Sequence, residues 1–183
     1  MFGQIAVFLV DTVVAFIVFL LLARFHFQWL RVPFRNPVGE FVLALTSWIV
    51  LPARRVIPGM AGLDLATLLL AWTLQALGLW IQISISGAQP GPLAIVMVAL
   101  VDLLRYSLYI LVFAVIVQAV MSWINPHAPL APVFDAMTRP FLRPLRRFVP
   151  LVANVDLTPL ILLVVLQVLL IPVAHLRVAA ATL

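Results

Sequence analysis

The chain alternates long apolar runs with short segments that are rich in arginine and proline. The apolar runs cover residues 5–23, 65–85, 93–123 and 157–176. At about 1.5 Å of rise per residue, about 20 helical residues cross the hydrocarbon core of a bilayer, which is about 30 Å thick. The pattern therefore predicts four membrane-spanning helices.

The segments between these spans predict two further helices. Residues 41–51 are apolar but too few to cross a bilayer, so they indicate an interfacial or shallow re-entrant helix that ends at Pro52. Residues 133–148 predict a second such element, which Pro144 should kink or split. On a helical wheel its four arginines occupy about a third of the circumference, opposite aromatic and aliphatic side chains, as in an amphipathic helix lying in the headgroup layer. The four are Arg139, Arg143, Arg146 and Arg147.

The two halves of the chain repeat one another. Residues that recur 92 positions later are Thr46 and Thr138, Pro52 and Pro144, Arg54–Arg55 and Arg146–Arg147, Asp64 and Asp156, and Gln75 and Gln167. A constant offset through so many identities indicates a tandem duplication. We assign residues 1–90 to the first repeat and 91–183 to the second, each a span, an interfacial helix and a span. The predicted fold is an all-α membrane protein with four transmembrane helices in two tandem parallel repeats, because two spans per repeat give both copies the same orientation.

Composition agrees with this class. The chain is 66% hydrophobic and 9% charged, which is outside the range of soluble domains. It has no cysteine, which excludes disulfides and thiol catalysis. The net charge of +5 comes from arginines that flank the spans, where anionic lipid and not nucleic acid is the natural partner.

The arginines also predict an orientation. Residues 24–62 contain five arginines and residues 121–155 contain four, whereas the turn at 86–92 and the N-terminus contain none. The positive-inside rule places both arginine-bearing connectors in the cytoplasm and both termini outside.

These arginines are the candidate functional residues. We interpret Arg54, Arg55, Arg139, Arg143, Arg146 and Arg147 either as a membrane-surface anchor or as a docking surface for anionic lipid or a partner membrane protein, since guanidinium groups bind phosphate and carboxylate. Replacing Arg146 and Arg147 with alanine is expected to abolish function while leaving the protein in the membrane.

Polar residues inside the predicted spans need a reason, because a lone charge at the bilayer centre costs at least about 2.5–3.5 kcal/mol. Asp102 and Arg105 have the spacing of helical neighbours and can pair within one span. An offset of 94, which aligns Trp29 with Trp123, places Asp11 opposite Arg105 at equal depth, and predicts an ion pair between them. Gln75 and Gln167 are expected near the midplane, where they could face one another and hydrogen-bond. Either a structural cluster or an ion path fits these residues.

Few other residues suggest chemistry. Asp64 and Asp156 are predicted to cap the helices that follow them. His26, His127 and His175 are dispersed, without metal-ligand spacing, and no nucleophile–base set or phosphate loop occurs. We therefore expect no enzyme activity, metal or cofactor.

The duplicated motif points to a family. Pro-Leu-Arg-Arg-Phe-Val-Pro at 144–150 and Val-Asp-Leu-Thr-Pro-Leu at 155–160 resemble the YggT family of bacterial and plastid membrane proteins, over nearly the whole chain. The first copy departs from the pattern, with Ala53 in place of the leucine and Ala66–Thr67 in place of Thr-Pro. The resemblance implies a small inner-membrane protein. Relatives are linked to cell division and envelope organisation, to osmotic and potassium response, and in plastids to cytochrome maturation, and no catalytic residues can be carried over.

Three functional hypotheses remain open. The first is a non-catalytic scaffold or assembly protein whose arginine elements bind lipid or a partner complex. The second is a small channel or transporter for ions or osmolytes, and the third is a haem-handling protein. A homodimer is compatible with each.

Overall fold

The structure, a computed structural model, describes residues 2–57, 59, 63–87, 89, 91–125, 127–149 and 156–183. It contains six helices over these residues: α1 (Phe2–Trp29), α2 (Pro37–Val56), α3 (Leu65–Ile85), α4 (Pro92–Ile124), α5 (Ala131–Phe148) and α6 (Thr158–Ala181). Four of them, α1, α3, α4 and α6, are long and apolar enough to cross a membrane. The prediction of an all-helical chain with four spans is confirmed. The connectors at 60–62 and 150–155 lie outside the described residues.

Two spans are longer than the sequence pattern predicted. Helix α1 continues to Trp29, so His26 is a buried residue of the span and not part of a connector. Helix α6 continues past residue 176 to Ala181, through a run of valine and alanine, and it therefore includes Arg177. Both extensions add a polar side chain to the helical bundle.

Helices α2 and α5 continue through prolines at which the sequence predicted a helix end or a kink. Helix α2 begins at Pro37 and passes Pro52, instead of covering 41–51 alone. Pro52 lies on the exposed side, where a carbonyl that loses its N–H partner can reach solvent. The opposite side of α2 stays buried through Val42, Thr46 and Val50, so packing holds the helix together. Helix α5 likewise contains Pro140 and Pro144 and is not split.

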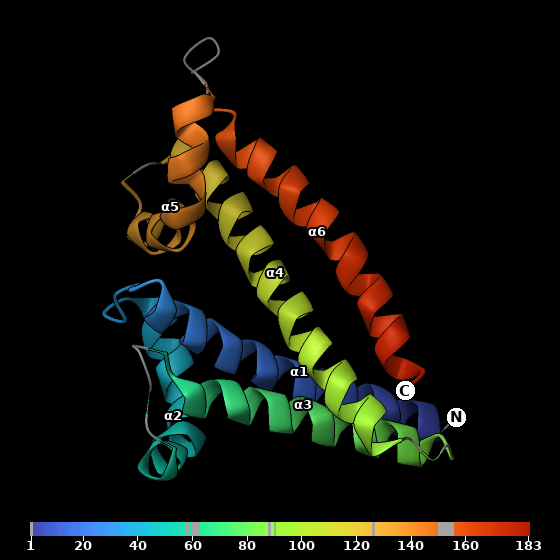
Figure 1. Cartoon of the computed structure of the whole chain (residues 1–183). Coiled ribbons are helices and arrows are strands. Elements are labelled where there is room, and N and C mark those ends of the chain that lie inside the picture. Colours follow the sequence, from blue (N-terminus) through green and yellow to red (C-terminus); the bar gives the residue numbers. More distant parts are fainter. Residues whose placement is uncertain are drawn as a thin grey trace.

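The helices pack mainly in two pairs, α1 with α3 and α4 with α6, and α3 also contacts α4. In Figure 1 the α1–α3 pair crosses the α4–α6 pair, the two termini lie at one end of the molecule, and α2 and α5 lie at the other. The largest apolar core joins residues from α1 to α5, and a second joins α4, α5 and α6. The two short helices therefore cap the same end of the bundle.

A glycine allows α1 and α3 to approach closely. A Cβ atom built on Gly78 would lie 2.7 Å from Cγ1 of Val14. The β-branched side chain of Val14 has little freedom to move aside in a helix. Small residues that let backbones approach are a common device in membrane helix pairs.

Candidate functional site

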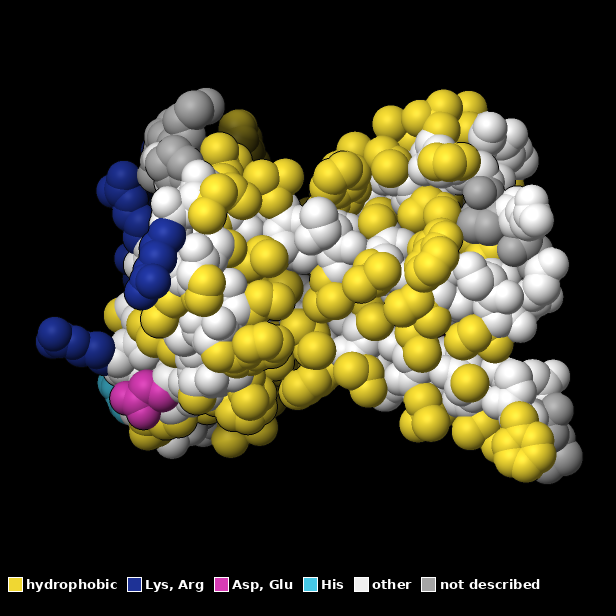
Figure 2. Space-filling model, turned by 90° about the horizontal axis from the view of Figure 1, so that it is seen from below, with side chains coloured by type: hydrophobic (Ala, Val, Ile, Leu, Met, Phe, Trp, Pro, Cys, Tyr) yellow, Lys and Arg dark blue, Asp and Glu magenta, His cyan; other side chains and the backbone are white. Residues whose placement is uncertain are grey.

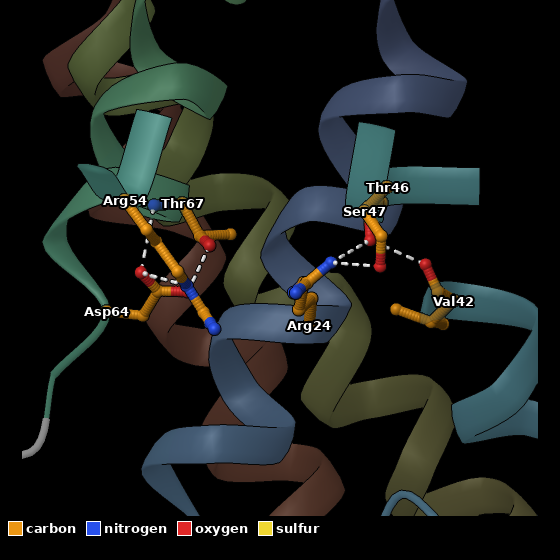
Figure 3. Close-up of polar contacts among 7 residues, drawn as sticks. All are labelled: Arg24, Val42, Thr46, Ser47, Arg54, Asp64 and Thr67. Atoms are coloured by element: carbon orange, nitrogen blue, oxygen red, sulfur yellow. Dashed lines mark hydrogen bonds and ion pairs between the residues drawn. The ribbon is translucent and has the colours of Figure 1, made fainter. Parts of the chain in front are cut away.

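An ion pair joins α2 to the start of α3. Nη2 of Arg54 lies 2.5 Å from Oδ2 of Asp64, and Nε of Arg54 lies 3.3 Å from Oδ1 (Figure 3). Asp64 is also the N-cap of α3, since Oδ1 accepts a hydrogen bond from the backbone N–H of Thr67 at 3.3 Å, and the Thr67 hydroxyl donates to Oδ2. One carboxylate thus holds α2 and α3 together.

The second repeat contains the corresponding ion pair. Nε of Arg146 lies 2.9 Å from Oδ2 of Asp156. Oδ1 of Asp156 accepts hydrogen bonds from the backbone N–H and the hydroxyl of Thr158, at 2.9 and 2.6 Å. Asp156 stands one residue before the N-cap position of α6, but it binds the first helical N–H as a capping residue does. The arginine–aspartate pair is therefore present in both copies.

The surroundings of these carboxyls favour the charged form. Burial alone would raise the pKa of Asp64, but hydrogen bonds from Arg54 and Thr67 outweigh it and leave the pKa below its usual value. For Asp156, burial again opposes the hydrogen bonds from Thr158 and Arg146, and the net pKa is also lowered. Both aspartates are therefore held as anions at neutral pH.

The remaining arginines of these helices are exposed. Arg55, Arg143 and Arg147 point away from the core, and none has an ion-pair partner among the described residues. Arg139 is exposed too and pairs with Asp135 one turn earlier on α5. Figure 2 shows the Arg side chains of one face gathered at a single end of the molecule, while hydrophobic side chains cover most of the rest.

A buried arginine, Arg24, connects α1 to α2 and was not predicted as a site residue. Its side chain is 2% exposed, and Nη1 donates to the hydroxyls of Thr46 at 2.8 Å and Ser47 at 3.2 Å (Figure 3). No described carboxylate forms an ion pair with it, and its Nε has no partner among the described residues. One sequence signal for this contact was that Thr46 recurs as Thr138. In the structure both threonines are fully buried.

An ion pair between two of the spanning helices involves Arg177, which the sequence pattern did not indicate. Asp102, on α4, is 2% exposed. Its Oδ1 accepts from Nε of Arg177 at 2.6 Å, and its Oδ2 accepts from Nη2 of Arg177 at 3.4 Å and from Nε2 of Gln75 at 3.1 Å. Asp102 thereby joins α3 of the first repeat to α4 and α6 of the second.

The predicted ion pair between Asp11 and Arg105 is wrong, and the possible pair between Asp102 and Arg105 does not form either. Neither the Asp11–Arg105 nor the Asp102–Arg105 pair is among the four ion pairs of the described residues. Asp11 accepts a hydrogen bond from Gln82 at 3.2 Å, because α1 packs mainly on α3. The Arg105 guanidinium lies 5.8 and 5.7 Å from the ring centroids of its own-helix neighbours, Tyr106 and Tyr109.

The possible hydrogen bond between Gln75 and Gln167 is also absent among the described residues. Gln75 is 5% exposed and bonds to Asp102, whereas Gln167 is exposed on α6. Helix α3 packs between α1 and α4, while α6 packs mainly on α4, with a smaller contact to α5. The same sequence position therefore faces the interior in one repeat and the surroundings in the other.

Four apolar helices and an arginine-bearing end define a multi-pass α-helical membrane protein. The model of the CCB3/YggT family matches residues 3–85 and 97–176, one segment in each half of the chain. The chain therefore belongs to the CCB3/YggT family.

The relatives have nearly the length of this chain. The uncharacterised protein YggT of Escherichia coli K12 is 34% identical over 170 residues, which is 92% of this chain and 88% of that protein. An uncharacterised protein encoded in the proC 3′ region of Vibrio alginolyticus is 29% identical over 163 residues, 87% of this chain and 88% of that protein. A Pseudomonas aeruginosa protein is 27% identical over 168 residues, 90% and 85% of the two chains. No solved structure matches the chain.

Proposed function

We propose that the protein is a non-catalytic scaffold of the bacterial inner membrane, whose helices α2 and α5 lie in the cytoplasmic headgroup layer and bind anionic phospholipid. The observation that carries the proposal is the division of the adjacent arginines into two kinds. Arg54 and Arg146 are bound to aspartates, whereas Arg55 and Arg147 have no ion-pair partner among the described residues; Arg146 is exposed, as Arg55 and Arg147 are, so the difference lies in the pairing.

In each adjacent pair, Arg54–Arg55 and Arg146–Arg147, the two arginines therefore have different roles. Arg54 and Arg146 fix the interfacial helix to the following span, so the helix is held in place without the lipid. Arg55 and Arg147, with Arg143, then present guanidinium groups to the lipid phosphates. Each basic residue near an anionic membrane surface contributes about 1 kcal/mol.

A parallel arrangement of the repeats brings both sets of arginines to one membrane surface. The position of α2 and α5 at the same end of the molecule supports it (Figure 1). By the positive-inside rule this end faces the cytoplasm and both termini face outward. The same guanidinium groups would engage an acidic connector of a partner membrane protein, which photocrosslinking from Arg147 would capture.

Lipid selectivity tests the proposal. The protein is reconstituted with spin-labelled phosphatidylglycerol or phosphatidylcholine, and the motionally restricted fraction of each lipid is measured by electron paramagnetic resonance. The wild type should prefer phosphatidylglycerol at low salt and lose the preference as salt screens the charges. The Arg55→Gln/Arg147→Gln variant should lose the preference and keep its unfolding midpoint.

The matched control removes the same amount of charge from the paired arginines. Arg54→Gln/Arg146→Gln should retain most of the preference but lower the unfolding midpoint, because it releases α2 and α5 from the capping aspartates. Equal loss of selectivity in the two variants would refute the division of roles.

A channel or transporter is the second candidate, favoured by polar cavities at the other end of the bundle. One cavity, of about 690 Å³, is lined by Asp11 and Gln82, and another, of about 470 Å³, by Gln82 and Arg177. The burial of Asp102 argues against transport, because this residue is nearly inaccessible and both of its carboxylate oxygens accept hydrogen bonds. An ion flux in liposomes that disappears in Asp11→Asn would favour transport over the scaffold.

A further inference from the structure

Helix α1 ends in an unusual way. The backbone N–H of Val32 bonds to the carbonyl of Phe27 at 2.8 Å, and that of Arg31 bonds to the carbonyl of Gln28 at 3.2 Å. This is the Schellman motif, whose residue after the cap adopts a left-handed conformation and is usually glycine. Here that residue is Arg31, with φ at 55°, and it is the one non-glycine residue with positive φ among those described. An arginine in this conformation is strained, whereas a glycine would adopt it readily. The side chain of Arg31 is therefore the feature that needs an explanation.

Arg31 stands at a cavity of about 720 Å³ between the end of α1 and the α2–α3 junction. The polar side chains lining the cavity are Gln28, Arg31, Arg54 and Asp64. The cavity lies at the arginine end of the bundle. Trp29, half exposed beside it, is the kind of residue that marks the membrane–water boundary. A lipid headgroup would therefore stand at the right depth to enter.

The charges around this cavity do not balance. Both oxygens of Asp64 are occupied by Arg54 and Thr67. Arg24, one helical turn before Gln28 on α1, is buried without an ion-pair partner among the described residues and lies within electrostatic range of Arg54 and Asp64. Arg31 and Arg54 line the cavity, Arg24 lies behind it, and the one lining carboxylate, Asp64, is already paired with Arg54, so the excess positive charge favours an anion.

A residue of the cavity wall also holds a buried acceptor without a donor, which in this structure is turned away from the cavity. Oε1 of Gln28 is buried and has no hydrogen-bond partner among the described residues. A buried acceptor left unpaired costs about 1–3 kcal/mol, so a ligand that supplies a donor gains by satisfying it. The cavity is therefore suited to an anion that also carries a hydroxyl group.

We infer that this cavity binds the headgroup of a single phosphatidylglycerol-type lipid. The phosphodiester lies against Arg31, and a glycerol hydroxyl donates to Gln28 after a turn of the amide toward the cavity. Phosphatidylcholine has no donor, and phosphatidylethanolamine would add a cation to a site with excess positive charge. The inference deepens the proposed function, because it adds one specific lipid to a surface that attracts anionic lipids in general.

The second repeat lacks this set of residues. At the offset of 94 that aligns α1 with α4, Gln28 corresponds to Ser122 and Arg31 to Asn125. Asn125 has φ at −154°, so this residue does not adopt the left-handed conformation of Arg31. The inferred stoichiometry is accordingly one lipid per chain.

Native mass spectrometry of the full-length protein in a maltoside detergent tests the inference. The probes are dioctanoyl phosphatidylglycerol, phosphatidylcholine and phosphatidylmethanol, the last an anionic phosphodiester without a hydroxyl. The wild type should bind one phosphatidylglycerol at least tenfold more tightly than phosphatidylcholine. Arg31→Gly, which relieves the backbone strain, should weaken this binding by roughly 10- to 100-fold while the unfolding midpoint stays the same or rises.

Two further variants separate the contribution of the Gln28 hydrogen bond from that of general positive charge in the connector. Gln28→Leu should abolish the preference for phosphatidylglycerol over phosphatidylmethanol. Arg35→Gln, which removes an exposed arginine of the same connector that does not line the cavity, should bind as the wild type does.

Wild-type affinity in Arg31→Gly, or equal losses in Arg31→Gly and Arg35→Gln, would overturn the site. Displacement of the lipid by an equal concentration of sn-glycerol 3-phosphate would overturn its assignment to a lipid. Arg55→Gln/Arg147→Gln should keep the single bound phosphatidylglycerol, so this site and the proposed surface selectivity can fail separately.

Discussion

Replacing Asp102 with asparagine tests how the two repeats are joined. The substitution keeps the size of the side chain but removes the charge that faces Arg177, whose Nε lies 2.6 Å from Oδ1. Breaking a fully buried pair costs about 3–5 kcal/mol, and breaking an exposed one about 0–1 kcal/mol. Because Asp102 is 2% exposed but the Arg177 side chain is 38% exposed, we expect a loss of about 2–3 kcal/mol of unfolding free energy.

The assay is reversible unfolding by dodecyl sulfate in mixed micelles, followed by helical circular dichroism. A double-mutant cycle of Asp102→Asn and Arg177→Met should give a coupling energy of about 1–3 kcal/mol. The matched control is the cycle of Asp11→Asn and Arg105→Gln, which should be additive within about 0.5 kcal/mol. Additivity in the first cycle, or coupling in the second, would refute the contacts described here.

Three other substitutions report on particular contacts through the same unfolding measurement. Gln75→Leu should cost about 1–3 kcal/mol because an oxygen of buried Asp102 loses a donor, whereas Gln167→Leu, on an exposed position, should change stability by less than about 0.5 kcal/mol. Gly78→Ala should cost about 1–3 kcal/mol through its clash with Val14, and a compensating Val14→Ala should recover part of the loss. The lowered pKa of Asp64 means that its stabilisation is complete above pH 3.8 and is lost as the pH falls through the folded-state pKa, so Asp64→Asn should flatten the acid limb of a stability–pH profile.

The sequence was sufficient to predict the spans and the capping aspartates, because these depend on local patterns. The run of apolar residues in α3 predicted bounds of 65–85, which are those observed. Asp64 follows Arg54 by ten residues, and Asp156 follows Arg146 by the same interval. The recurrence of that spacing was a signal for the ion pairs that fix α2 and α5.

The intramembrane contacts could not be predicted in the same way. Repeat alignment gives the depth of a residue, but the direction of its side chain depends on which helices are neighbours. Asp11 and Arg105 were aligned in depth, yet α1 packs on α3 and turns Asp11 toward Gln82. Arg177 was not predicted as a partner because the apolar run appeared to end at residue 176, whereas α6 continues to Ala181 and brings Arg177 to Asp102.

The central claim is that both arginine helices face one membrane surface, the cytoplasmic one. Because the chain has no cysteine, single cysteines introduced at Arg55, Arg147 and Ser86 can be labelled selectively in cells. A membrane-impermeant maleimide should label the Ser86 position in intact spheroplasts, and the Arg55 and Arg147 positions only after the membrane is permeabilised. Labelling of either arginine position in intact spheroplasts would contradict the account.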